Sequence, residues 1–212
     1  AFNFMMEQKH LEILQRTQQL FMQFGIKSQT VSDIASKLGV SKKTLYLYIN
    51  NKEDLVMQVM KMFIEYQKQK FEEILQQPLN AIDRFIAINQ EIGQQLKQMH
   101  PSVMFDVQKY YPEAWEMVRQ FKNDFIAKLI VDNIEQGIGE GLYRKNINPE
   151  IVSFLYVNMA DNLFTINDLS LKYSIVQLHK ELARYHIRAV ANEKGINYLQ
   201  QTFNNKDENE NY

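Results

Sequence analysis

Residues 30–55 read TVSDIASKLGVSKKTLYLYINNKEDL, and two short helices with a tight turn between them are predicted in this stretch. Either Thr30 or Ser32 can accept a hydrogen bond as the N-cap of the first helix. Apolar residues then recur at helical spacing along one face: Val31, Ile34, Ala35 and Leu38. Gly39 can supply the left-handed turn that ends this helix, and Ser41 can cap the next one. This order is that of a helix-turn-helix.

The second helix has an apolar side and a polar side. Leu45 and Ile49 lie four residues apart and are predicted to point back into the core. The outward positions hold lysine and hydroxyl side chains, which suit phosphates and the edges of bases in a DNA groove. These residues are Lys42, Lys43, Thr44, Tyr46 and Tyr48. The other interpretation is a plain hairpin of two helices, in which the tyrosines are half-buried and the lysines are merely solvated.

The rest of the chain is predicted to be almost entirely helical. Only seven glycines and four prolines occur in 212 residues, and Val, Ile and Thr do not gather in alternating runs. Charge divides the chain, because residues 1–52 hold seven Lys or Arg against three Asp or Glu, whereas residues 53–212 hold 17 against 22. A basic head and an acidic body follow. This asymmetry fits nucleic acid at the head, and it also fits an unevenly solvated surface.

Residues 30–55 resemble the DNA-binding head of the tetracycline-repressor family of bacterial regulators. The shared positions are Thr30, Ile34-Ala35, Gly39-Val40-Ser41, Thr44-Leu45-Tyr46 and Lys52-Glu53-Asp54-Leu55. Lys43 departs from the small residue that is usual in the family, and Ile49 departs from Phe. The resemblance implies an all-α fold, with a three-helix DNA-binding head over residues 1–52. A helical ligand-binding and dimerisation bundle is expected over residues 53–203.

The resemblance also implies how the outward residues meet double-stranded DNA. Positions that hold phosphates in the family are occupied here by Thr30, Thr44, Tyr46 and Lys52. Positions that reach bases are occupied by Lys42, Lys43 and Tyr48. Ser41, as the cap of the recognition helix, completes the predicted DNA-binding set. One short recognition helix buries too little surface to specify an operator, so a homodimer on a palindromic operator is expected.

A glycine-punctuated link, residues 134–151, resembles the segment before the penultimate helix of this family. The last two long helices, expected at 149–168 and 171–193, would pair with those of a second copy as a four-helix bundle. Their apolar faces hold Val152, Leu155, Tyr156, Met159 and Leu163 on the first helix, and Ile175, Leu178, Leu182, Tyr185 and Ala189 on the second. Either face could instead serve the core of the monomer. The final residues, 204–212, are polar and acidic and are expected to be disordered.

The central helices of this family hold an effector pocket, and the equivalent segment here is rich in methionine and aromatic residues. Such side chains suit an adaptable cavity for a small apolar or amphipathic ligand. The candidate pocket residues are Met60, Phe63, Phe85, Ile88, Ile92, Phe105, Tyr110, Tyr111, Trp115, Val118, Phe121 and Phe125. Tyr110, Tyr111 and Trp115 form the expected mouth. Any one of these residues could instead belong to the plain core.

Enzymatic and membrane functions find little support in the sequence. No Gly-x-Ser-x-Gly, phosphate-binding glycine loop or His-Glu-x-x-His occurs, so we predict no enzyme, no catalytic residue and no cofactor. Cysteine is absent, and His179 and His186 share a helical face without a third ligand, so no metal site is predicted. No run approaches the ~20 apolar residues of a membrane span, and the chain does not open on a secretory signal. A cytoplasmic protein is therefore expected.

The predicted function is a ligand-responsive, DNA-binding transcriptional repressor. A small apolar effector would release it from a palindromic operator. The alternative is an all-helical small-molecule-binding or interaction protein without DNA-binding activity. A DNA-retardation assay with the upstream region of its own gene would distinguish the two.

Overall fold

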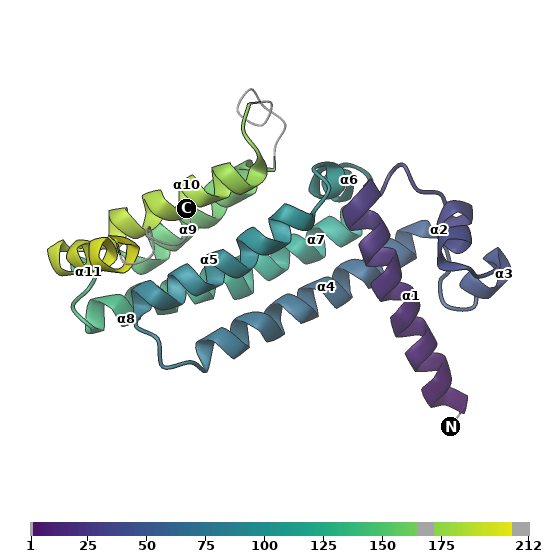
Figure 1. The fold of residues 1–212 in the computed structure, drawn as a ribbon, viewed down its shortest axis with the longest axis horizontal. Helices are drawn as coiled ribbons and strands as arrows, with labels where there is room; N and C mark the ends of the chain where they lie inside the picture. The colour runs from purple at the N-terminus through teal and green to yellow at the C-terminus, as the bar shows by residue number, and fades with distance from the viewer. Residues whose placement is uncertain (1, 165–171, 205–212) are drawn as a thin grey trace. The chain divides into compact units, whose positions relative to one another are not determined.

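The computed structural model describes residues 2–164 and 172–204 (Figure 1). The helices are α1 (Phe2–Phe24), α2 (Val31–Leu38), α3 (Lys42–Leu45), α4 (Lys52–Leu75), α5 (Ala81–Gln98), α6 (Ser102–Tyr110), α7 (Pro112–Gln120), the π-helix η1 (Phe121–Ile126), α8 (Ala127–Gly139), α9 (Pro149–Asn162), α10 (Ile175–Val190) and α11 (Glu193–Asn204). The described residues contain no β-strand, only an isolated bridge between Tyr143 and Ala191. The predicted all-α class is confirmed. None of the described helices is both long enough and apolar enough to cross a membrane.

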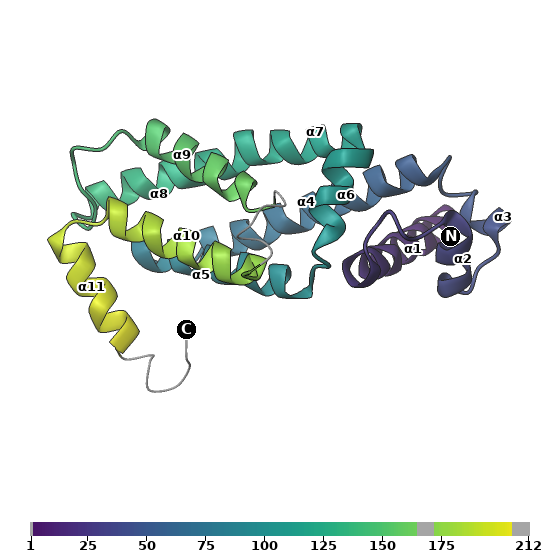
Figure 2. The same cartoon turned by 90° about the horizontal axis from the view of Figure 1, so that it is seen from above.

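The helices gather into two compact units. The first unit contains the chain up to Lys70 together with Lys97–Phe121. The second unit contains Phe71–Leu96 and the chain from Lys122 onward. Within the second unit, α8 packs against α9 and α9 packs against α10 (Figure 2).

The predicted helix-turn-helix is present in the first unit. Thr30 caps α2 through a reciprocal pair of hydrogen bonds with Asp33, so Thr30 rather than Ser32 is the N-cap. Gly39 adopts a φ of 70°, in the left-handed region, and the Ser41 side chain caps α3. Most of the predicted inward residues are buried, namely Ile34, Ala35, Leu38, Leu45 and Ile49, whereas Val31 is only half-buried. Local capping and apolar spacing therefore account for this motif.

In the second unit, the Tyr143 ring packs directly against Gly137 near the end of α8. Tyr143 is fully buried, and its hydroxyl donates to Asn133 Oδ1 at 3.1 Å. The backbone N–H groups of Leu142 and Tyr143 both donate to the carbonyl of Gly137. A Cβ atom on Gly137 would lie 2.1 Å from Tyr143 Cδ2. Glycine is therefore needed at this position for the chain after α8 to fold back against the helix.

The C-terminal helices differ from the prediction. Helix α9 ends at Asn162, α10 ends at Val190, and a further helix, α11, follows. The Asn192 side chain separates the last two helices, because its oxygen accepts from the Gly195 N–H while its amide donates to the carbonyl of Tyr143. Residue 204 belongs to α11, and the rest of the tail predicted to be disordered, 205–212, lies outside the described residues.

The two apolar faces predicted for pairing are divided between core and surface. Tyr156 on α9 and Leu182 on α10 are buried in the core of the second unit, so for these two residues the structure bears out the core alternative and contradicts an outer, pairing face. Leu155, Met159 and Tyr185 are exposed. Helix α9 is apolar on both sides, with core residues on one and exposed residues on the other. Spacing alone could not distinguish these two sides.

Replacing Gly137 with alanine tests the packing of Tyr143 against this glycine. The added methyl group would overlap the buried ring, so the variant should lose about 1–3 kcal/mol of unfolding free energy, the usual cost of overpacking a core. Gly139→Ala is the matched control, because nothing lies within 4 Å of a Cβ atom there and alanine favours a helix. Urea denaturation followed by circular dichroism measures both variants. Equal stability of the two would contradict the packing described.

Candidate nucleic-acid interface

The surface around α3 brings together most of the side chains predicted to bind DNA. Lys42, Lys43 and Tyr46 are exposed, and Lys42 Nζ lies 5.9 Å from the centroid of the Tyr46 ring. The hydroxyl groups of Ser41 and Thr44 lie 2.8 Å apart at the start of the same helix. Ammonium and hydroxyl groups on one outward surface can donate hydrogen bonds to phosphates and to base edges.

Two buried side chains determine which side of α3 faces outward. The helix has only one turn, which is too short to be stable by itself. Leu45 and Ile49 are buried below it, whereas Leu47 is 66% exposed. Leu47 is thus part of the outward surface, although sequence reasoning missed it. The spacing of Leu45 and Ile49 already implied its direction, and an apolar side chain there can contact a thymine methyl group.

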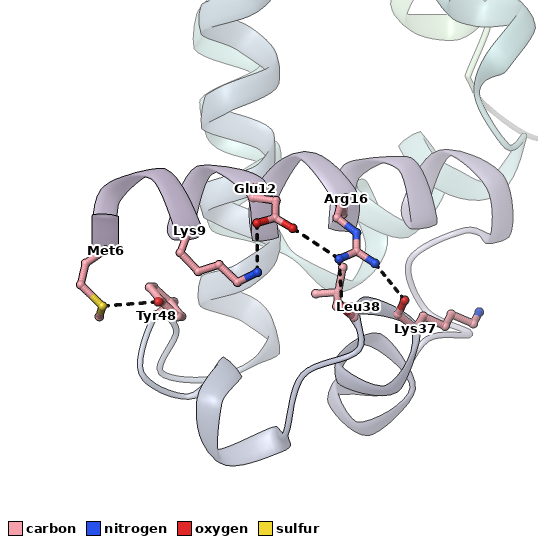
Figure 3. Close-up of polar contacts among 7 residues, drawn as sticks. All are labelled: Met6, Lys9, Glu12, Arg16, Lys37, Leu38 and Tyr48. Atoms are coloured by element: carbon pink, nitrogen blue, oxygen red, sulfur yellow. Dashed lines mark hydrogen bonds and ion pairs between the residues drawn. The ribbon is translucent and has the colours of Figure 1, made fainter. Parts of the chain in front are cut away.

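Tyr48 lies between helices rather than on the open surface of α3. Its ring stacks on His10 of α1, with centroids 5.4 Å apart, and its hydroxyl donates to Met6 Sδ at 3.6 Å (Figure 3). The Gln58 side chain of α4 donates to the Tyr48 carbonyl at 3.2 Å. The structure therefore gives Tyr48 intramolecular partners on both α1 and α4. Contact with a base stays a prediction for this residue.

Arg16 of α1 holds the end of α2. Its guanidinium donates to the carbonyl of Leu38 at 2.9 Å and to that of Lys37 at 3.3 Å (Figure 3). Glu12, one turn earlier, lies 3.5 Å from the same guanidinium. A cation at the C-terminus of a helix satisfies carbonyls that lack helical partners. Sequence reasoning missed Arg16, because its target is formed only when α2 packs on α1.

The two predicted phosphate contacts at the edges of the motif also have partners within the chain. The Thr30 hydroxyl donates to Asp33 Oδ2 at 2.6 Å and is the main cause of the lowered pKa of Asp33. Lys52 Nζ donates to the carbonyls of Ile26 at 2.8 Å and Lys27 at 3.4 Å. Burial of Lys52 lowers its pKa, although nearby carboxylates oppose this effect. Lys52 therefore ties the start of α4 to the turn between α1 and α2.

Asp106 of α6 binds the same turn from its N–H side. Its Oδ2 atom accepts from the backbone N–H of Ile26 at 3.0 Å, from that of Lys27 at 2.9 Å and from the Ser102 hydroxyl at 3.2 Å. Gly25 adopts a φ of 78°, and a Cβ atom on it would lie 2.5 Å from Ser102 Oγ. Helix α6 thus approaches the turn closely, and a buried carboxylate holds two of its amides.

Two of the three residues predicted to form a pocket mouth, Tyr110 and Tyr111, contact residues of this same region. The Tyr110 hydroxyl accepts from Lys27 Nζ at 2.7 Å, and this hydrogen bond lowers the pKa of Tyr110. Tyr111 is buried, and burial raises its pKa to about 12. Both tyrosines therefore serve the junction of α6, α7 and the helix-turn-helix within the first unit.

The predicted effector residues divide between the two units. The first unit contains Met60, Phe63, Phe105, Tyr110, Tyr111, Trp115, Val118 and Phe121, and the second contains Phe85, Ile88, Ile92 and Phe125. Phe125 stacks on Phe71, with ring centroids 6.4 Å apart. Met60, Val118 and Phe85 are buried, while Phe63, Phe105 and Trp115 are half-buried.

The second unit contains a small cavity of about 30 Å³ that Phe85, Ile88 and Ile92 help to line. The rest of its lining is Asn89, Ile126, Leu129, Ile130, Asn133 and Tyr156. The two asparagines and the tyrosine were missed by sequence reasoning, although Asn89 and Asn133 each follow an apolar lining residue, Phe85 and Leu129, by one helical turn. A space of this size holds about one water molecule, so the cavity is closed to a larger ligand.

A basic helix-turn-helix followed by a second helical unit defines the class of DNA-binding transcriptional regulators. Residues 13–59 match the family of bacterial regulatory proteins known as the tetR family. The uncharacterised helix-turn-helix regulator YvaF of Bacillus subtilis is 28% identical over 153 residues, which cover 72% of this chain and 79% of YvaF. The repressor KstR2 of Mycobacterium tuberculosis is 24% identical over 148 residues, covering 66% and 72%.

Solved structures share this fold. The KstR2 structure superposes with a TM-score of 0.57 at 19% identity, covering 87% of this chain and 96% of KstR2. The regulator AibR, solved in complex with isovaleryl coenzyme A and operator DNA, gives a TM-score of 0.57 at 16% identity, covering 82% and 95%. In its head, residues 13–59, the chain is therefore similar to the tetR family of bacterial regulatory proteins.

The Asp106 contact can be tested by mutation. Asp106→Ala leaves two backbone N–H groups of the turn without a partner, so unfolding free energy should fall by at least about 2 kcal/mol. DNA binding should weaken with it, although Asp106 is buried and cannot touch DNA. Ser102→Ala is the control, since it removes one hydroxyl group but keeps both hydrogen bonds from the backbone N–H groups to Asp106. Urea denaturation and fluorescence anisotropy with labelled upstream DNA measure the two effects. An Asp106→Ala protein as stable as Ser102→Ala would show that the carboxylate does not hold the turn.

Proposed function

We propose that this regulator acts as a repressor that binds a palindromic operator as a homodimer and leaves it when a small apolar effector binds. The observation that carries this proposal is the capped α3, which presents two exposed lysines while its apolar side is buried. The relative KstR2 is named a repressor, and AibR was solved with an acyl-coenzyme A and with operator DNA. These two relatives support a ligand-controlled repressor. Because its operator is chromosomal DNA, we place its action in the cytoplasm.

The proposed DNA contacts fall into two groups. Lys42, Lys43 and Leu47 lie outward on or just after α3, where a recognition helix reaches base edges in the major groove. Thr44 and Tyr46 flank them and suit phosphates. For Lys52, we propose that contact with a phosphate competes with, or adds to, its bonds to the turn at Ile26 and Lys27.

Alanine variants of the α3 lysines test the proposed readout. If Lys42 donates to a guanine edge, Lys42→Ala should cost about 1–3 kcal/mol per half-site on the operator and relax the preference at one symmetric base pair. A lysine that holds phosphate should instead weaken operator and random DNA alike. With two copies per dimer, its loss should lower the slope of log affinity against log salt by about 1.8. Fluorescence anisotropy across salt concentrations and single-base operator variants measures both quantities for Lys42→Ala and Lys43→Ala.

Lys145→Ala is the control, because Lys145 is an exposed lysine in the second unit. If Lys42→Ala and Lys43→Ala bind DNA as tightly as Lys145→Ala and the wild-type protein do, the α3 surface does not recognise the DNA sequence. If the wild-type protein retains no DNA at all, a helical small-molecule-binding protein becomes the better description.

The proposed dimer surface is the exposed apolar side of α9. Ile151, Phe154, Leu155 and Met159 are all exposed there, and Phe154 is 66% exposed. Tyr185 on α10, which packs against α9, is 67% exposed. A continuous group of large apolar side chains on a water-facing helix usually marks an interface. A two-fold dimer also supplies the second recognition helix that a palindromic operator requires.

Charged substitutions on this surface test the dimer. Phe154→Glu combined with Leu155→Glu should give a folded monomer, because both side chains are exposed and their loss leaves the core of the second unit intact. Tyr66→Glu, at another exposed aromatic position, should leave the dimer unchanged. Analytical ultracentrifugation at micromolar concentration, with circular dichroism as a check on folding, distinguishes the two. A Phe154→Glu, Leu155→Glu protein that remains dimeric would rule out this side of α9.

A further inference from the structure

Among the described residues, two buried side-chain nitrogens of the second unit have no hydrogen-bond partner, Arg84 Nε and His186 Nε2. His186 lies on α10 and is 5% exposed. A buried polar atom without a hydrogen bond costs about 1–3 kcal/mol, so native proteins seldom retain one without a reason. A ligand that is absent from the structure is one such reason.

The His186 ring packs against two residues that line the cavity. It stacks on Phe85 with centroids 4.9 Å apart, and on Tyr156 with centroids 4.4 Å apart. Phe85 and Tyr156 both line the cavity, and their own rings lie 5.9 Å apart. A shift of either ring would therefore extend the cavity to the imidazole. Tyr156 is held at its hydroxyl by a single-point contact with Asn89 Oδ1 at 3.0 Å.

The chemistry of this region favours an uncharged ligand. None of the residues that line the cavity is charged, and most are apolar. Burial lowers the pKa of His186 to about 4, so its imidazole is neutral at pH 7 and offers no positive charge to an anion. Tyr156 is also kept neutral, since burial raises its pKa. An ionised carboxylate would lose its hydration here without gaining a cation.

We propose that the cavity is the closed form of the effector site, and that His186 Nε2 hydrogen-bonds an uncharged hydroxyl or carbonyl group on an otherwise apolar effector. The apolar body of the ligand lies along Ile88, Ile92 and Ile126, and its oxygen meets the imidazole between Phe85 and Tyr156. This inference rests on the proposed effector-controlled function and adds the chemical class of the effector.

The test compares 1-octanol with octanoate, two probes of the same chain length that differ in charge. Isothermal titration calorimetry of the full-length protein at pH 7 should show octanol binding at least tenfold more tightly than octanoate. His186→Phe keeps an aromatic ring against Phe85 and Tyr156 but removes the nitrogen, and it should weaken octanol binding about tenfold. His179→Leu is the control, because His179 is also buried on α10 but makes no ring contact with this cluster in the described residues.

A second measurement reports on the imidazole itself. In a nitrogen-15 NMR spectrum, the His186 Nε2 resonance should move when octanol is added, whereas the His179 resonances should not. Octanol should also reduce the affinity of the wild-type protein for its upstream DNA, and about tenfold more octanol should be needed for the same effect on His186→Phe. His186→Phe should be at least as stable to heat as the wild-type protein, because it removes an unpaired buried nitrogen.

Three results would overturn the proposal: octanoate binding as tightly as octanol, neither probe binding at millimolar concentration, or an unmoved His186 resonance in the octanol complex. In each case the wild-type protein could still bind its upstream DNA, so the proposed regulatory function would stand. If the wild-type protein without any ligand does not bind DNA, the proposed function is contradicted. The calorimetry and NMR measurements would still decide whether His186 contacts the ligand.

Discussion

The turn between α1 and α2 is held between an anion and a cation. The Asp106 carboxylate accepts the backbone N–H groups of Ile26 and Lys27, and the Lys52 ammonium donates to the carbonyls of the same two residues. Each charge faces the end of the peptide dipole that attracts it, and the attraction between the charges offsets part of the cost of their burial. The helix-turn-helix follows directly after this turn, so its place in the first unit depends on α4 and α6 together.

The helix-turn-helix itself could be predicted from sequence because its causes are local. Thr30, Gly39 and Ser41 act on backbone groups within a few residues of themselves, and the spacing of Leu45 and Ile49 sets which side of α3 is buried. Such signals depend on capping and helical geometry alone. The outward lysines follow by elimination once the inward residues are known.

The contacts that position the motif could not be predicted in the same way. Asp106 lies 80 residues from the turn that it binds, and it is an ordinary acidic residue in the sequence. Arg16 and Tyr48 likewise find their partners only after α1 packs on the motif. In the second unit, α9 is apolar on both sides, so its sequence did not reveal that Tyr156 is buried while Phe154 is exposed. The apolar spacing of the helices around the cavity likewise did not indicate that Asn89, Asn133 and Tyr156 line it.

The short length of α3 has a consequence for how this protein can change over time. The energy that folds the helix comes from its cap and from the side chains beneath it, whereas Lys42, Lys43 and Leu47 contribute little to stability because they face water. If these three positions read bases as proposed, mutations there alter which DNA sequence is recognised while the head stays folded. A gene duplicate of this regulator could acquire a new set of target promoters through a few surface substitutions, without first passing through an unstable intermediate.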